Sequence, residues 1–338
     1  MALSSDEIIK REIADTIVLK HGIRLRIFPE SSNDDQVLFS EGGLTFGIDG
    51  CSYGSCDACW YTDENWKDGF DGNIVNKKPI IALEGTDALN RKSSGNAQYQ
   101  RFHHALGAVK NGLIGIYYLR KGSDKIQEDL FGMAYNASKI EKGDYLIVDD
   151  LQIVQDIIDL YDNPTALRSY IDEYLEKMYQ IFKEKFEKVY NGSWQTFSEK
   201  RSTIIEKDYV IKYAGRMRRN FTDSSQRAGH IAVGEMYLTK YYFNNKKVYY
   251  LFPKMTKKDL LFLDNHKGTD KEWFLLRHEP NVQILTMDDL IGLSDSVKSI
   301  LLSIQDEPLK GDAMKKFNHS VGIIWAGLRN GSVTINHS

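Results

Sequence analysis

The chain of 338 residues has few cysteines, no long apolar run and little net charge. Its three cysteines are an odd number and stand close together, which excludes the disulfide framework of a small secreted protein. No stretch approaches the roughly 18 continuous apolar residues that cross a bilayer, and acids appear early at the N-terminus, unlike a signal peptide. We therefore expect a cytoplasmic protein in a reducing compartment, without a membrane partner.

Common cofactor signatures are also missing. The sequence contains neither a G-x-G-x-x-G nor a P-loop motif, which argues against the usual nucleotide-dependent enzymes. The net charge of −3 hides an uneven distribution, because residues 199–258 carry 14 Lys and Arg against 5 Asp and Glu. A basic region beside an acidic remainder suits a protein that binds a phosphate backbone and metal ions.

Hydrophobic periodicity predicts a mixed α/β fold, with a central mixed sheet flanked by helices and a helix-rich C-terminal half. Helices are expected over 5–22, 93–112, 164–190, 224–242 and 287–305, and strands over 23–28, 44–48, 79–83, 113–119, 145–148, 248–252 and 282–285. Residues 50–78 show little periodicity and are predicted to form a structured loop that ends in a hairpin. The pair Asn163-Pro164 begins the longest helix, so we place a boundary between regions 1–163 and 164–338.

An Asp and a Glu occupy the two ends of the predicted hairpin. Asp71 opens a short strand, an Asn-Lys-Lys turn follows, and the apolar strand 79–83 ends at Glu84. Antiparallel pairing would bring both carboxylates to one edge of the sheet, where they can hold Mg²⁺ for phosphodiester hydrolysis. Alternatively, Asp71 caps a turn and Glu84 pairs with a nearby base. Two further acids are reserve ligands, Asp49 and Asp87.

This order of elements resembles the PD-(D/E)XK nuclease superfamily, whose restriction endonucleases place an Asp, a turn, an apolar strand ending in Glu or Asp, a helix and another strand. The resemblance covers roughly residues 1–120. It implies a restriction-endonuclease-like core, a Mg²⁺-dependent endonuclease of type II restriction systems that cuts double-stranded DNA, and a homodimer that matches a palindromic site.

One position departs from the family pattern. The family's lysine two positions after the acid is Thr86 here, which can orient a water molecule but carries no positive charge. We expect Lys92, Gln98 or Arg101 to complete the catalytic group.

The cysteines follow a C-x4-C-x2-C spacing that suits a tetrahedral Zn²⁺. They are Cys51, Cys56 and Cys59, and the candidates for a fourth ligand are His103, His104 and Asp57. A complete structural zinc site usually has a second cysteine pair, so three reduced cysteines without metal is the alternative.

Closely spaced arginines and a glutamine in the basic region suit phosphate contacts and base reading in a DNA groove. The expected DNA-binding residues are Arg216, Arg218, Arg219, Gln226 and Arg227. Such a segment can equally be a solvated surface. The rival function is therefore a non-catalytic, zinc-stabilised nucleic-acid-binding protein.

Overall fold

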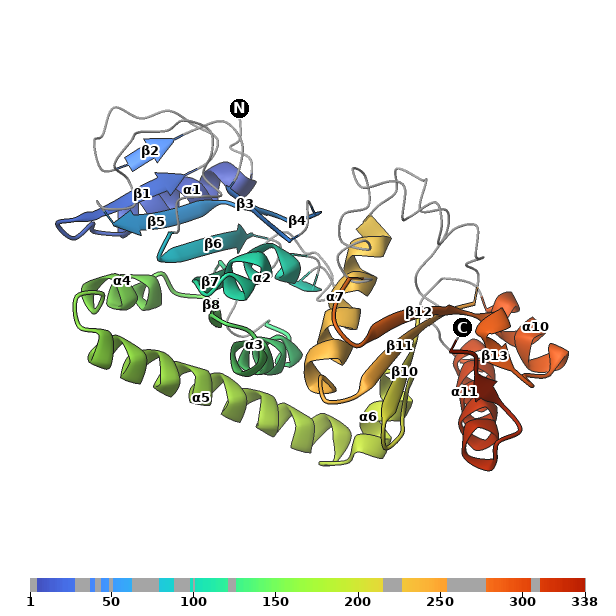
Figure 1. Cartoon of the computed structure of the whole chain (residues 1–338). Coiled ribbons are helices and arrows are strands. Elements are labelled where there is room, and N and C mark those ends of the chain that lie inside the picture. Colours follow the sequence, from blue (N-terminus) through green and yellow to red (C-terminus); the bar gives the residue numbers. More distant parts are fainter. Residues whose placement is uncertain are drawn as a thin grey trace. The chain divides into compact units, whose positions relative to one another are not determined.

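The computed structural model describes most of the chain in two compact units, Met1–Lys185 and Phe186–Ser338 (Figure 1). The described residues are 5–27, 37–39, 44–48, 51–62, 79–87, 98–99, 101–120, 126–214, 227–253, 278–304 and 311–337. Among these residues, no helix combines the length and the apolar character needed to cross a bilayer.

The first unit is built on a six-stranded mixed sheet with the order β2-β1-β5-β6-β7-β8. Its strands are β1 Ile23–Ile27, β2 Val37–Phe39, β5 Ala58–Thr62, β6 Ile81–Thr86, β7 Ile114–Leu119 and β8 Asp144–Val148, and a separate hairpin joins β3 Leu44–Ile48 to β4 Cys51–Cys56. Its helices are α1 Ser5–Thr16, α2 Phe102–Lys110, α3 Asp129–Ile140, α4 Gln152–Asp159 and the long α5 Pro164–Tyr190. The predicted mixed α/β class is confirmed.

Strand directions alternate and then become uniform across this sheet. Strand β5 lies antiparallel to β1 and to β6, whereas β6, β7 and β8 run parallel. Strands β6 and β7 are joined through α2, which is the helical crossover that a parallel pair requires. The carboxyl ends of β6 and β7 therefore lie together at one edge of the sheet.

Two glycines allow helices to approach opposite faces of the sheet. A side chain at Gly85 would meet Ile9 of α1 at 2.6 Å, and one at Gly115 would meet Val109 of α2 at 2.5 Å. Gly115 pairs with Ala82 of β6. Ala82 and Gly85 are three residues apart on this strand, so they face opposite sides of the sheet. Helices α1 and α2 thus cover different faces, and the end of β6 lies between them.

Helix α5 buries the apolar stripe that its sequence predicts. Ile171 and Met178 are buried, the Tyr174 hydroxyl donates to the carbonyl of Ile147, and the Ile147 N–H approaches Met178 Sδ at 3.4 Å. These contacts attach the first part of α5 to β8. The helix begins at the predicted boundary, Pro164, but because of this packing the compact units divide later, between residues 185 and 186.

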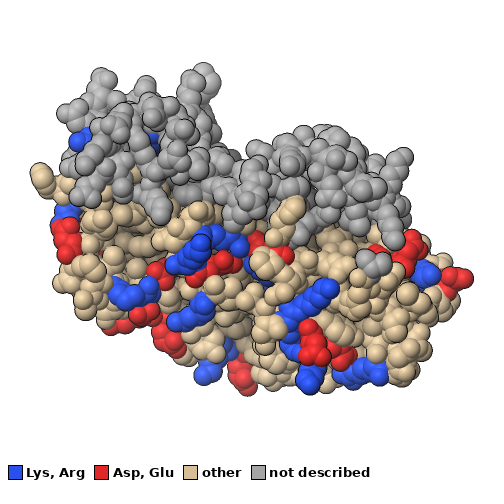
Figure 2. Space-filling model, in the orientation of Figure 1, with Lys and Arg blue, Asp and Glu red and all other residues tan. Residues whose placement is uncertain are grey.

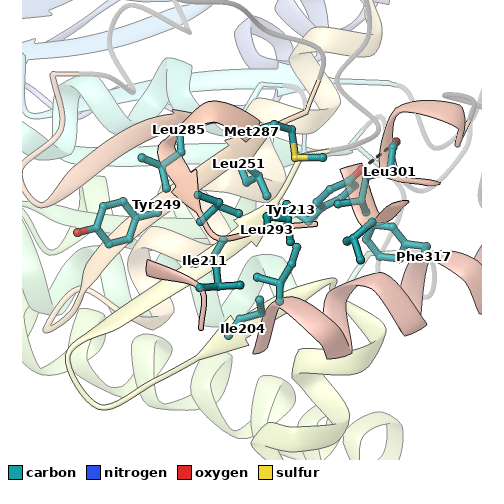
Figure 3. Close-up of a cluster of buried hydrophobic side chains, with 14 of the residues drawn as sticks. Ile204, Ile211, Tyr213, Tyr249, Leu251, Leu285, Met287, Leu293, Leu301 and Phe317 are labelled. Carbon is teal, nitrogen blue, oxygen red and sulfur yellow. Dashed lines mark hydrogen bonds between the residues drawn. The ribbon is translucent and has the colours of Figure 1, made fainter. Parts of the chain in front are cut away.

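The second unit has a four-stranded sheet with the order β12-β11-β10-β9. Its elements are α6 Trp194–Lys200, β9 Thr203–Ile205, β10 Tyr209–Tyr213, α7 Arg227–Tyr242, β11 Lys247–Phe252, β12 Val282–Thr286, α10 Asp295–Ser303, α11 Asp312–Asn330, and the small pair β13 Leu290–Ile291 and β14 Thr334–Ile335. Figure 3 shows its core, where Ile211, Leu251 and Leu285 of the sheet pack with Phe317 of α11. The Tyr213 hydroxyl donates to the Leu301 carbonyl in the same core.

Two sequence expectations about local structure were wrong. Residues 50–78 were expected to be a loop with a terminal hairpin, but Cys51–Cys56 and Ala58–Thr62 are strands. The helix expected over 287–305 starts only at Asp295, because Met287–Asp289 forms a 3-10 turn and Gly292 has a φ of +89°, in the left-handed region that interrupts a helix.

Candidate functional site

Glu84 lies near the end of β6, at the edge of the sheet where β6 and β7 both end. The strand is fully apolar up to this residue, and the Glu84 side chain is buried with only 2% of its surface exposed. A carboxylate in such a place is costly unless charges or hydrogen bonds compensate it. The local sequence thus delivers an ionisable group into the protein interior, as predicted.

The antiparallel neighbour of β6 brings a different Asp to Glu84 than the sequence predicted. Ala58 of β5 pairs with Leu83, and Asp57 directly precedes this pair, next to the end of β6. The Asp57 N–H donates to the Leu83 carbonyl at 2.8 Å, and the Gly85 N–H donates to Asp57 Oδ2 at 2.9 Å. Backbone groups on both sides of Glu84 therefore hold Asp57 at the end of β6. The two side chains turn to different helices, Asp57 to Lys10 of α1 and Glu84 to His104 of α2.

Three basic side chains surround the two carboxylates. Lys10 of α1 lies 3.4 Å from Asp57 Oδ1, while Arg101 Nη1 and His104 Nδ1, beside and on α2, lie 3.0 Å and 3.3 Å from Glu84 Oε1. Both contacts to Glu84 use Oε1. Among the residues that the structure describes, no hydrogen bond to Glu84 Oε2 is found.

Burial and charge act on the two carboxyl groups in opposite directions. Burial is the largest cause and the like charge of Glu84 the next, and they raise the pKa of Asp57 to about 7. For Glu84, burial also raises the pKa, but His104 and Arg101 together outweigh it and hold the pKa below its ordinary value. At neutral pH, Glu84 is ionised, and Asp57 lacks enough positive charge around it to be fully ionised.

The donor set fits a hard cation. Asp57 and Glu84 offer carboxylate oxygens, and Mg²⁺ in nucleases typically takes one or two carboxylates and fills its other positions with water and substrate phosphate. Within the described ranges, no three His, Cys, Asp or Glu side chains converge in a group that could hold a metal by themselves. The Mg²⁺ expectation is thus a matter for experiment.

Other predicted catalytic residues have different surroundings. Thr86 is buried at the end of β6, two positions after Glu84. The Gln98 side chain accepts a hydrogen bond from the Gln127 N–H at 2.8 Å, which ties it to the segment ahead of α3. Asp87, a reserve ligand, pairs with Arg120 at 3.2 Å. Three predicted residues, Asp71, Lys92 and Asp49, lie outside the described residues.

Sequence reasoning missed Asp57 and Lys10 as members of this site. Asp57 was considered only as a fourth zinc ligand, because the partner of β6 was sought in the residues immediately before it. Lys10 belongs to the first helix, far away in sequence. Arg101 was named as a replacement for the missing lysine, and it does reach Glu84.

The cysteines are strand residues rather than loop residues. Cys56 and Cys59 are buried in one apolar cluster, and burial raises the pKa of both thiols well above its ordinary value. A zinc ligand must be a thiolate, so this apolar environment favours the protonated thiol over a zinc-binding thiolate. Cys51 belongs to β4, and its side chain lies outside the described part. Zinc binding stays a prediction.

Residues at the start of strand β4 also match a sequence motif of serine hydrolases. Residues 50–54 read G-C-S-Y-G, which matches G-x-S-x-G. In a nucleophile elbow this serine occupies a sharp turn between a strand and a helix. Here Ser52 is inside β4 and pairs with Gly47 of β3, so the backbone context differs from that of a nucleophilic serine.

The predicted DNA-binding residues fall largely outside the described ranges. Arg216, Arg218, Arg219 and Gln226 are not described, and Arg227 begins α7 without a described side chain. On the face shown in Figure 2, Lys and Arg are interspersed with Asp and Glu over the described surface. The basic region proposed from the sequence therefore stays a prediction.

Comparison with known proteins gives no relative from which a role could be transferred. No family model, no curated protein and no solved structure matches this chain.

Proposed function

We propose that this protein is a metal-dependent endodeoxyribonuclease, similar to type II restriction enzymes, and that Asp57 and Glu84 hold its metal ion. The observation that carries the proposal is that two largely buried carboxylates, Asp57 and Glu84, meet the end of β6, each next to basic side chains. Hydrolysis of a phosphodiester needs a site that concentrates negative oxygen ligands next to positive side chains, and this edge of the sheet has both.

The order of elements supports the same proposal. A helix, an antiparallel set of strands carrying Asp57 and Glu84, the crossover helix α2 and the parallel strand β7 follow one another. The PD-(D/E)XK resemblance calls for an acid, an apolar strand ending in Glu, a helix and a strand in this order. We assign Asp57, in place of Asp71, to the first acid of that correspondence and keep Glu84.

Each charged residue has a definite role in the proposed reaction. Mg²⁺, when bound, would lower the pKa of a bound water and neutralise charge on the phosphate. Asp57 and Glu84 would hold the ion. Arg101 and His104 keep Glu84 ionised and hold its Oε1, and Oε2 would then bind the metal ion. Lys10 provides the positive charge that Thr86 lacks.

Cleavage itself is the first test. Incubation with long unmethylated double-stranded DNA and Mg²⁺ should yield discrete fragments, and EDTA should abolish the cleavage because the two carboxylates alone cannot activate water. Gel electrophoresis over a titration of Mg²⁺ and Mn²⁺ measures this. Binding of DNA without cleavage in either metal would instead support the non-catalytic alternative.

Replacing Lys10 tests the source of positive charge. We expect Lys10→Met to lower the cleavage rate about 10- to 100-fold, a loss typical of residues that act through a metal ligand. The side chain stays long and apolar, so the packing of α1 should be kept. Lys142→Met is the matched control, since Lys142 belongs to the same unit but has no contact with the carboxylate pair. Equal losses in both variants would contradict the role of Lys10.

A further inference from the structure

The second unit contains a groove of about 730 Å³ between α6 and α11. This volume is within the range of pockets that enclose a small ligand. Its walls combine two indoles with amide, carboxylate and guanidinium groups from both helices. The groove is lined by Trp194, Gln195 and Glu199 of α6 and by Gly322, Trp325 and Arg329 of α11, among others.

Trp194 presents a fixed aromatic surface to the groove. Its side chain is 45% exposed, which is unusual for so large an apolar group. Phe186, Phe197 and Phe243 pack around the same indole with ring centroids 4.7 Å, 5.3 Å and 5.1 Å away. The three phenylalanine rings therefore hold the indole in place without covering it. The exposed part of the indole offers a surface on which a flat ligand can stack.

The α11 wall leaves room for such a ligand. A side chain built at Gly322 would have no atom within 4 Å, so the helix backbone is bare at this point of the groove. Trp325, three residues further, carries the Arg329 guanidinium at 4.5 Å from its ring. Its indole Nε1 is buried and has no acceptor among the described residues. The wall is thus aromatic and recessed at Gly322.

The polar groups of the groove favour a base over a phosphate. Glu199 repels phosphate, and Arg329 shares its charge with Glu206 at 3.2 Å. Gln195 Nε2 lies 3.4 Å from Glu199 Oε1, which sets a carboxylate and an amide side by side. A carboxylate accepts hydrogen bonds from the exocyclic amino group of a base, as Glu does with cytosine.

From these features we propose that the groove binds an unstacked, amino-bearing nucleobase of single-stranded DNA, with the base against Trp194 and its amino group on Glu199. Aromatic side chains commonly hold unstacked bases in this way, and carboxylate contacts select among them. The inference rests on the proposed function, because it gives the DNA-cutting protein a site for a displaced base.

Binding of labelled 12-nucleotide oligo(dC) and oligo(dT), measured by fluorescence anisotropy in EDTA, tests the proposal. Oligo(dC) should bind more tightly than oligo(dT). Trp194→Ala and Gly322→Leu should each weaken oligo(dC) binding about 5- to 100-fold, the range seen when a stacking partner is lost. Glu199→Gln should reduce the preference for oligo(dC). Leu302→Ala, at an exposed apolar position of α10 outside the groove, should bind like the wild type.

Gly322→Leu also separates binding from folding. The new side chain fills the groove, meets no protein atom at its Cβ, and replaces glycine inside a helix, so the melting temperature should be equal or higher. Equal affinity for both oligonucleotides, or wild-type binding by the Trp194 and Gly322 variants, would overturn the proposal. A protein that binds oligo(dC) through the groove yet never cuts duplex DNA in Mg²⁺ would overturn the nuclease assignment alone.

Discussion

Asp57→Asn and Glu84→Gln should each lower Mg²⁺-dependent DNA cleavage by on the order of 10²- to 10³-fold, the scale of losing one group that stabilises charge in a transition state. Both substitutions keep the shape of the side chain and remove one negative charge. The Asn oxygen at position 57 can still accept from the Gly85 N–H. The loss should therefore come from the metal site, not from the fold, and single-turnover cleavage of a defined duplex measures it.

A matched carboxylate shows whether the effect is specific. Glu141 forms a partly buried ion pair with Lys110 at 2.9 Å, at the other end of α2. Glu141→Gln should cleave DNA at close to the wild-type rate. Asp71→Asn is the informative comparison, because the sequence pattern alone pointed to that residue. Full activity in Asp57→Asn together with a loss in Asp71→Asn would refute the assignment of Asp57 to the metal site.

Asp57→Asn should also make the metal-free protein more stable at alkaline pH, by about 1–3 kcal/mol. The carboxyl group of an unfolded chain ionises near 3.8, whereas the pKa of Asp57 in the folded protein is raised to about 7. Between these values the folded state binds a proton that the unfolded state does not. The stability of the wild type therefore falls as pH rises from about 4 to 7, and the full cost is present above 7.

Denaturant unfolding in EDTA at pH 5 and pH 8.5 measures this effect. The gain from Asp57→Asn should be small at pH 5 and large at pH 8.5. Mg²⁺ should raise the stability of the wild type at pH 8.5 and leave the variant nearly unchanged. Glu141→Gln, which removes an ion-paired carboxylate, should show no such gain. A variant that is less stable than the wild type at pH 8.5 would contradict the electrostatic account of Asp57.

Strong helical periodicity made parts of the fold predictable. The helix over Pro164–Tyr190 has its proline at the first position and a regular apolar stripe, and the structure reproduces both. The parallel strands after α2 were likewise recognisable from short, fully apolar runs, such as Ile114–Leu119. In these segments local preference and tertiary packing agree, so pattern alone identified them.

The strands over residues 51–62 could not be predicted because their composition indicates turns. Gly, Ser, Asp and Cys dominate the segment, and these residues favour loops unless neighbours complete the sheet. In the fold, β5 is enclosed between β1 and β6, and its Trp60, Tyr61 and Thr62 are residue types common in strands. This tertiary effect hid the partner strand of Glu84.

The acidic pair predicted from the sequence, Asp71 and Glu84, stays a prediction, because Asp71 lies outside the described residues. Short hairpins are the commonest connection between antiparallel strands, which led to Asp71. In the structure, residues 63–80 connect β5 to β6, and Asp57, just before β5, bonds to the backbone on both sides of Glu84. Such a long connection leaves no local signal, so only coordinates identify the partner. Lys10 was hidden for the same reason.

Locating the metal ion tests the central claim most directly. A crystal grown with Mn²⁺ and measured at the manganese absorption edge should show one anomalous peak within bonding distance, roughly 2.0–2.5 Å, of oxygens from both Asp57 and Glu84. A peak that contacts other acids, or an unoccupied carboxylate pair in a protein that cuts DNA in the same Mn²⁺, would contradict it.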